Sequence, residues 1–165
     1  MTLVFGAARG RFLPKFNAGV MRNSALERVI VTDLSKLKPG LQGHAELVVG
    51  EQHTAPRIGS GRVHVLATPV MINLMEAAAL DAVENLIPAG HQSLGTRLDV
   101  RHIAATPVGM RVRASAKLVA VDGRTLEFRV EAHDERDLIG DGAHTRLVVN
   151  VERFDRRVQA KLVPR

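Results

Sequence analysis

One long apolar segment, residues 70–87, constrains the fold of this chain more than any other feature. Its polar residues are only Asn73, Glu76, Asp81, Glu84 and Asn85. Thr68 suits the N-cap of a helix and Pro69 suits its first turn, whereas Pro88-Ala89-Gly90 would end it. The segment therefore predicts a single helix that is apolar around most of its circumference. Such a helix has to be largely surrounded by protein.

The regions on either side of this helix predict β-strands, because apolar and polar side chains alternate along them. The expected strands comprise residues 44–50, 62–66, 97–105, 111–121, 125–134 and 142–153. Asp122-Gly123 is a hairpin signal between two of them. One buried helix with antiparallel strands is an α+β fold, in which we expect the sheet to curl around the helix. Such a sheet has edge strands that a second copy can cover, so we expect a homodimer.

Basic residues are concentrated at the two ends of the chain. Residues 1–40 carry seven Lys and Arg against two acidic residues, and residues 152–165 carry five against two. We therefore expect a basic N-terminal extension over 1–37, a folded domain over 38–157 and a basic C-terminal tail over 158–165. All five aromatic residues are Phe, so stacking surfaces for single-stranded nucleic acid are few. We expect no nucleic-acid partner.

Several classes of site are excluded by what the chain lacks. It has no cysteine, which rules out disulfides, thiolate metal sites and a cysteine nucleophile. The seven histidines show no metal-ligand spacing, and no phosphate-binding loop or hydrolase motif is present. No apolar run approaches the roughly 18–20 residues that span a bilayer, and no secretory signal is recognisable. We expect a cytoplasmic protein that needs no metal, no cofactor and no membrane.

Three polar residues are candidates for chemistry. Glu76 lies in the middle of the apolar helix, and its alternative position is an exposed stripe shared with Asn73. His102 falls on the apolar face of its strand, where a core histidine bonded to the backbone is the alternative. Capping the helix accounts for Thr68 without any catalytic role. Together, an acid, a histidine and a hydroxyl form a candidate acid/base or nucleophile set.

The stretch from Ala67 to Glu76 resembles the helix-opening motif of the fluoroacetyl-CoA thioesterase family. In that motif a Thr is followed eight residues later by the Glu of a Leu-Met-Glu sequence, as Thr68 and Glu76 are here. His102 follows Glu76 by 26 residues, the spacing of the family's catalytic histidine. Ser93-Leu94-Gly95-Thr96 is similar to a turn of the family, and the likeness covers about residues 38–160.

The resemblance implies a hot-dog fold, in which an antiparallel sheet wraps around one long central helix. It also implies a homodimer that hydrolyses a short-chain acyl-CoA to the free acid and coenzyme A, with coenzyme A supplied as part of the substrate. By position, Thr68, Glu76 and His102 would be the catalytic set, and the backbone N–H of Gly95 would bind the thioester oxygen. Whether Glu76 attacks directly or directs a water molecule is open.

The chain departs from this family ahead of the helix. The fluoroacetyl-specific enzyme carries phenylalanines over its acyl pocket, where Gly59 and Arg62 stand here. We therefore predict a broader or different preference for short acyl groups. Two other functions remain: a second hot-dog chemistry such as hydration of an enoyl-CoA, and a non-catalytic acyl-CoA-binding or regulatory protein.

The residues that would hold the coenzyme A phosphates are not marked by any motif. The candidates are basic residues close to the expected site: Arg97, Arg101 and Arg146. Solvated charges on a strand face are the alternative interpretation of all three.

Overall fold

A computed structural model describes residues 32–163, so most of the predicted N-terminal extension lies outside the described part. In chain order the elements are β1 (Gln42–Val48), η1 (Glu51–His53), α1 (Ala55–Ile58), α2 (Thr68–Val83), η2 (Glu84–Leu86), β2 (His91–His102), β3 (Arg111–Asp122), β4 (Thr125–His133), β5 (Leu138–Asn150), α3 (Val151–Gln159) and η3 (Ala160–Leu162). The strands form one antiparallel five-stranded sheet in the order β1-β3-β4-β5-β2. The prediction of an α+β fold is confirmed.

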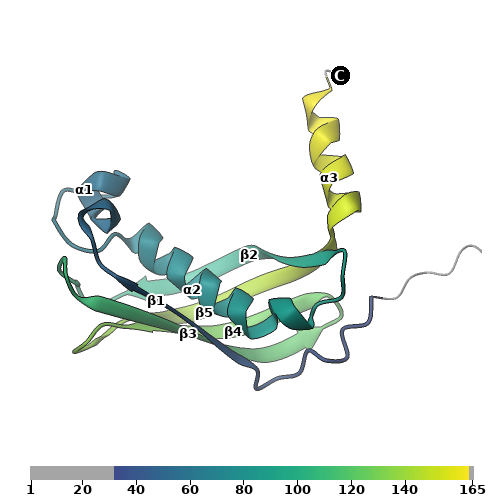
Figure 1. Cartoon of the computed structure of the whole chain (residues 1–165), viewed down its shortest axis with the longest axis horizontal. Coiled ribbons are helices and arrows are strands. Elements are labelled where there is room, and N and C mark those ends of the chain that lie inside the picture. Colours follow the sequence, from purple (N-terminus) through teal and green to yellow (C-terminus); the bar gives the residue numbers. More distant parts are fainter. Residues whose placement is uncertain (1–31, 164–165) are drawn as a thin grey trace, which may run out of the picture. The chain divides into compact units, whose positions relative to one another are not determined.

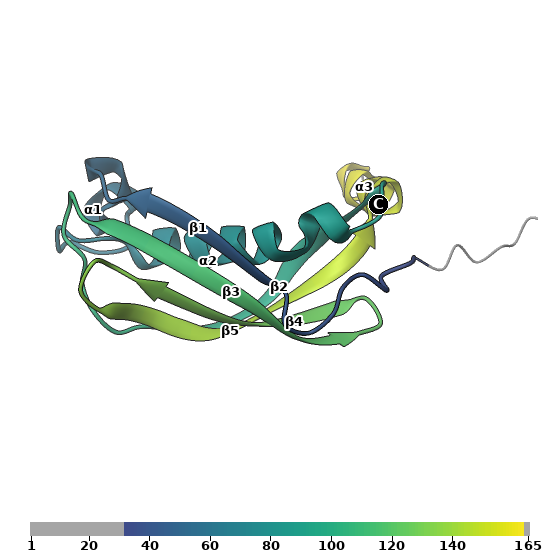
Figure 2. The same cartoon turned by 60° about the horizontal axis from the view of Figure 1, so that its bottom comes forward.

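The helix α2 lies along the concave side of this sheet, as Figures 1 and 2 show. Its buried residues point at the sheet: Met71, Leu74, Met75, Ala78, Ala79, Ala82 and Val83. The contact with β1 is so close that a Cβ atom added to Gly43 would lie 2.8 Å from Ala82 Cα and would collide with the carbonyl oxygen of Ala78. Alanines on the helix and a glycine on the strand thus bring the two backbones together. In the described part of the chain, no helix is long and apolar enough to cross a membrane.

The strand β2 is an edge of the sheet. It pairs only with β5 in the described residues, from His91 opposite Asn150 to His102 opposite Gly140, and the register shifts between Gly95 and Arg97. Leu98, in the middle of the strand, is 38% exposed. One face and one edge of this twelve-residue strand are therefore uncovered within a single chain.

Two sequence predictions about this fold were wrong. Residues 62–66 form no strand; only an isolated bridge joins Thr54 to Leu66, within a loop that follows the short α1. The last strand, expected to run to residue 153, ends at Asn150. The side-chain oxygen of Asn150 accepts a hydrogen bond from the backbone N–H of Arg153 at 3.0 Å and caps the start of α3. Val151, Phe154 and Val158 recur every three or four residues, which is helical spacing.

Candidate active site

Thr68 and His102 meet where α2 begins and β2 ends. Thr68 Oγ1 lies 2.8 Å from Nδ1 of His102. The expected cap was wrong, because Ala67 is the N-cap and Thr68 is the first helical residue, with no side-chain capping bond. The hydroxyl is thereby free for the histidine. In the described chain, Nδ1 of His102 therefore contacts a side-chain hydroxyl.

The second ring nitrogen of His102 is available for chemistry. Nε2 is buried and has no hydrogen-bond partner among residues 32–163. Burial lowers the pKa of His102 below its ordinary value of 6.5, and the backbone of Ala104 opposes this shift only in part. A neutral imidazole with one nitrogen held and the other unpaired can take or give a proton.

An open hollow of about 400 Å³ adjoins this pair. Thr68 and His102 line it together with Arg62 from the preceding loop, and its apolar walls include Val63, Val65, Leu66 and Ile103. Both Val63 and Ile103 are largely exposed. Apolar walls beside a few polar groups are typical of small-molecule sites.

Glu76 lies two helical turns from Thr68, about 12 Å along the axis. Its side chain is 36% exposed, and Oε1 is 3.8 Å from both Nε2 of His144 and Nη1 of Arg146. Gly95 lies directly against this carboxylate, because a Cβ atom there would collide with Glu76 Oε1. One chain therefore brings together Thr68 with His102 and, separately, Glu76 with Gly95. The four predicted residues do not form one cluster.

Beneath Glu76 lies a buried polar network that the sequence interpretation missed. Arg146 is 4% exposed, and its Nε donates to Ser93 Oγ at 2.9 Å while Nη2 donates to the Ser93 carbonyl at 2.8 Å. The Ser93 hydroxyl in turn donates to Glu84 Oε2 at 3.0 Å. Nη1 of Arg146 lies 3.1 Å from His144 Nε2, and His144 Nδ1 lies 2.9 Å from the carbonyl oxygen of Arg97. A signal for this network was available: residues 144 and 146 are polar at alternate positions on the inward face of a strand.

Known proteins resemble this chain in sequence and in fold. A sequence model of the fluoroacetyl-CoA-specific thioesterase family matches residues 49–152. The chain belongs to this family. A fluoroacetyl-CoA thioesterase of Streptantibioticus cattleyicolor is 45% identical over 97 residues, which is 59% of this chain and 70% of that protein.

Solved structures agree with this family. A variant of a fluoroacetyl-CoA thioesterase in complex with acetyl-CoA superposes with a TM-score of 0.72 at 36% identity, over 76% of this chain and 98% of the other. A hot-dog-like protein from Thermanaerovibrio acidaminovorans superposes with a TM-score of 0.73 at 20% identity, over 81% of this chain and 99% of the other. The expected hot-dog fold is therefore confirmed.

In this member of the fluoroacetyl-CoA-specific thioesterase family, the three arginines named as phosphate candidates are already engaged. Arg146 is inside the domain and 4% exposed, so neither of its two interpretations, a phosphate-binding residue or a solvated strand-face charge, describes it. Arg101 forms a two-pronged ion pair with Asp141, at 2.9 and 2.7 Å. Arg97 lies 3.7 Å from Asp99, with both side chains largely exposed. For these last two, the solvated strand-face interpretation fits better.

Proposed function

We propose that this chain hydrolyses short-chain acyl-CoA thioesters to the free acid and coenzyme A, as a homodimer in the cytoplasm. The observation that carries the proposal is the 2.8 Å contact between Thr68 Oγ1 and His102 Nδ1. It leaves Nε2 buried beside a hollow, with no hydrogen-bond partner among residues 32–163. Membership of the fluoroacetyl-CoA-specific thioesterase family supports hydrolysis over enoyl-CoA hydration. The reaction requires water and the side chains named below, with no separate cofactor or metal.

In the proposed reaction, the Glu76 carboxylate attacks the thioester carbon. The carbonyl oxygen becomes an oxyanion, which the backbone N–H of Gly95 stabilises. The carbon–sulfur bond breaks, and coenzyme A departs as its thiolate. Water then hydrolyses the acyl-Glu76 anhydride. Neutral His102 takes up the proton that this water loses and passes it to the thiolate of coenzyme A. The guanidinium of Arg146 lies 3.8 Å from Glu76 Oε1, the oxygen that faces Gly95.

Attack by a water molecule that Glu76 directs is the other route to the same products. A single turnover in ¹⁸O-labelled water distinguishes them. Label in the Glu76 carboxylate supports direct attack, because cleavage of the anhydride can return a labelled oxygen to the protein. Label confined to the released acid argues for attack by water.

A homodimer would unite the two separate groups. We propose that the uncovered edge of β2 pairs with the same strand of a second copy, antiparallel and about a two-fold axis near Leu98. In that register His102 of one copy lies within about one residue of Gly95 of the other along the strands. The thioester would then lie between Glu76 of one copy and the Thr68–His102 pair of its partner. The exposure of Leu98 supports this contact.

The test is thiol release from a panel of short acyl-CoAs. We expect Glu76→Gln and His102→Ala to lose at least about a hundredfold in kcat/KM, because each removes an acid/base or nucleophilic group. Glu127→Gln, an exposed residue of β4, is the matched control and should keep wild-type activity. If both variants keep wild-type turnover, the proposed catalytic site is wrong. Tight acyl-CoA binding without any turnover would instead support the binding or regulatory function.

Mixing the two inactive variants tests the shared site. A hybrid dimer has one site with both defects and one site with neither, so random exchange of subunits should restore about a quarter of wild-type activity. If Glu76 and His102 act within one chain, mixing restores nothing. Size-exclusion chromatography with light scattering checks that both variants are dimers.

A further inference from the structure

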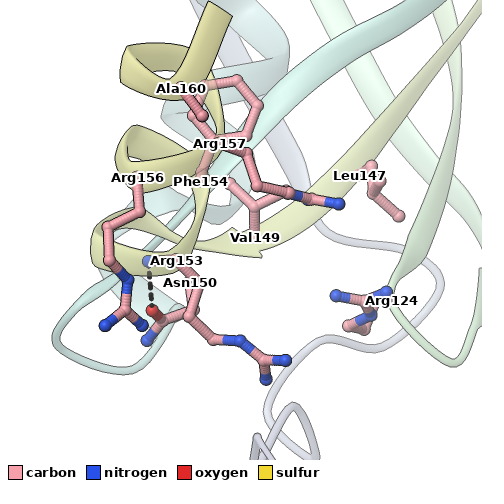
Figure 3. Close-up of a pocket in the computed structure, with 9 residues that line it drawn as sticks. All are labelled: Arg124, Leu147, Val149, Asn150, Arg153, Phe154, Arg156, Arg157 and Ala160. Atoms are coloured by element: carbon pink, nitrogen blue, oxygen red, sulfur yellow. Dashed lines mark hydrogen bonds between the residues drawn. The ribbon is translucent and has the colours of Figure 1, made fainter. Parts of the chain in front are cut away.

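A second hollow, distinct from the candidate active site, lies between α3, the end of β5 and the turn that joins β3 to β4 (Figure 3). Its volume is about 620 Å³. Four of the residues that line it are arginines: Arg124, Arg153, Arg156 and Arg157. None of the lining residues in the described part of the chain is acidic. Three of the arginines lie on α3 and Arg124 lies in the turn between β3 and β4, so the four charges converge only in the folded chain.

Most of this charge is uncompensated. Arg156 lies 3.4 Å from Glu152 on the same helix, but Arg124, Arg153 and Arg157 form no ion pair in the part of the chain that the structure describes. Figure 3 shows the guanidinium groups of these three around one open space. Like charges held close together repel one another unless an anion lies between them. Guanidinium groups bind phosphate with two parallel hydrogen bonds.

The hollow also has an apolar floor. Leu147 and Val149 of β5 line it beside Phe154 of α3, and Val149 is 7% exposed. A phosphate alone would leave this floor unused, whereas a ligand that joins phosphates to a planar or apolar group would cover it. An aromatic ring next to arginines is the usual surface for a nucleobase.

We propose that this arginine hollow binds a small molecule that carries two or more phosphate groups. Two sources share this chemistry: the nucleotide end of the acyl-CoA substrate, which rests on the proposed function, and a separate phosphorylated metabolite that does not. A nucleic acid fits less well, because Glu152 and Asp155 interrupt the basic surface of α3 and the charge gathers in a concavity. The hollow therefore selects a compact polyanion.

The test uses adenosine 3′,5′-bisphosphate as the probe and adenosine as its uncharged counterpart, in isothermal titration calorimetry on the full chain. The triple variant Arg124→Gln, Arg153→Gln and Arg157→Gln should bind the bisphosphate at least about tenfold more weakly than wild type. The matched control is Lys38→Gln, Lys117→Gln and Arg136→Gln, which removes the same charge from exposed positions outside the hollow. Adenosine should not bind measurably to either.

Kinetics separate the two sources. We compare acetyl-CoA with S-acetyl-N-acetylcysteamine, a thioester without a nucleotide. If the triple variant raises KM for acetyl-CoA only, the ligand is the nucleotide end of the substrate. If it loses the bisphosphate but keeps KM for both thioesters, the ligand is a separate phosphorylated molecule.

Two results overturn the proposal. One is that the bisphosphate binds the triple variant as tightly as wild type, or binds neither. The other is that wild type binds only an oligonucleotide. Because the calorimetry requires no turnover, an inactive wild-type protein would count against the proposed hydrolysis and leave this proposal to be judged by binding alone.

Discussion

Arg146 Nη1 donates a hydrogen bond to His144 Nε2 across 3.1 Å, and this contact fixes the protonation state of the imidazole. Arginine cannot accept a hydrogen bond, so Nε2 is the acceptor. The carbonyl oxygen of Arg97 cannot donate, so the hydrogen on Nδ1 points to it across 2.9 Å. His144 is therefore neutral, in agreement with a pKa that burial lowers below 6.5 and that the charge of Arg146 lowers further. The only cation facing Glu76 from this network is the guanidinium.

Removing the acceptor on His144 should destabilise the domain. In His144→Leu, Arg146 Nη1 keeps its position but loses its buried partner, and the expected cost is about 1–3 kcal/mol of unfolding free energy. His144→Gln retains a carbonyl acceptor and should lose less. Urea denaturation measures both, with the exposed His133→Leu as control. Equal losses of unfolding free energy in His144→Leu and His144→Gln would show that the packing of His144, and not its hydrogen bond, determines its contribution to stability.

The pH at which activity falls on the acid side of the pH–rate profile should be low. Burial lowers the pKa of His102, so its neutral form persists as the pH falls through 6.5. The neutral imidazole is the form that accepts a proton, so kcat/KM should fall only when the pH passes below this lowered pKa. Initial rates measured from roughly pH 4.5 to 8, a range that spans the titration of histidine, test this expectation. A half-maximal point above pH 6.5 would contradict the expected assignment.

The hydroxyl of Thr68 should matter through His102. Thr68→Val keeps the shape of the side chain but removes the only side-chain group within hydrogen-bond distance of Nδ1 in the described chain, so kcat should fall by at least about tenfold. Thr68→Ser keeps a hydroxyl and should retain most activity. Steady-state kinetics of the two variants give the comparison. A serine variant as impaired as the valine variant would point to a role for the methyl group instead.

Position 95 should tolerate nothing larger than glycine. In Gly95→Ala the new Cβ collides with Glu76 Oε1 and lies 3.1 Å from His144 Cε1. The end of the Glu76 side chain can swing aside, so the fold should survive while kcat falls about a hundredfold, the usual effect of misplacing a reacting group. Gln92→Ala, an exposed change on the same strand, is the control. Unchanged kcat in Gly95→Ala would remove Glu76 from the reaction.

The acyl preference should not favour fluoroacetyl groups strongly. Arg62 lines the hollow beside Thr68 and His102, where aromatic side chains are absent. An open, partly charged wall gives little discrimination between acyl groups of similar size, so kcat/KM for fluoroacetyl-CoA and acetyl-CoA should agree within about tenfold. Parallel assays with both substrates measure the ratio. A much larger preference for the fluorinated group would show that discrimination needs no aromatic lid.

Patterns along the chain were sufficient for the fold but not for the site. The apolar helix, five of the six expected strands and the Asp122-Gly123 turn, where Gly123 has a φ of +55°, follow from local sequence and are present. The last helix, α3, was missed because Val151 follows an apolar strand without a break, and only the Asn150 cap marks the change. A spacing of three or four residues becomes visible only over a longer window.

The separation of Glu76 from His102 could not be read from one chain. Sequence spacing gives the distance along a helix or strand, but which ends of α2 and β2 meet depends on how the sheet curls. The network under Glu76 depends likewise on pairing between β2 and β5, which sets Ser93 opposite Val148 and Gly95 opposite Arg146. Both relationships arise only when segments distant in the sequence pack together in the folded chain.

The contact between Gly43 and α2 has a consequence for how this protein can vary. Side chains that interdigitate can be exchanged for others of similar volume, but here the helix rests on the main chain of β1 itself, at Ala78 and Ala82. Any side chain at position 43 would lift the helix and carry Glu76 with it. Backbone atoms therefore set the position of the helix and of Glu76 on it. Exchanges of core side chains elsewhere should leave the distance of this carboxylate from the sheet unchanged.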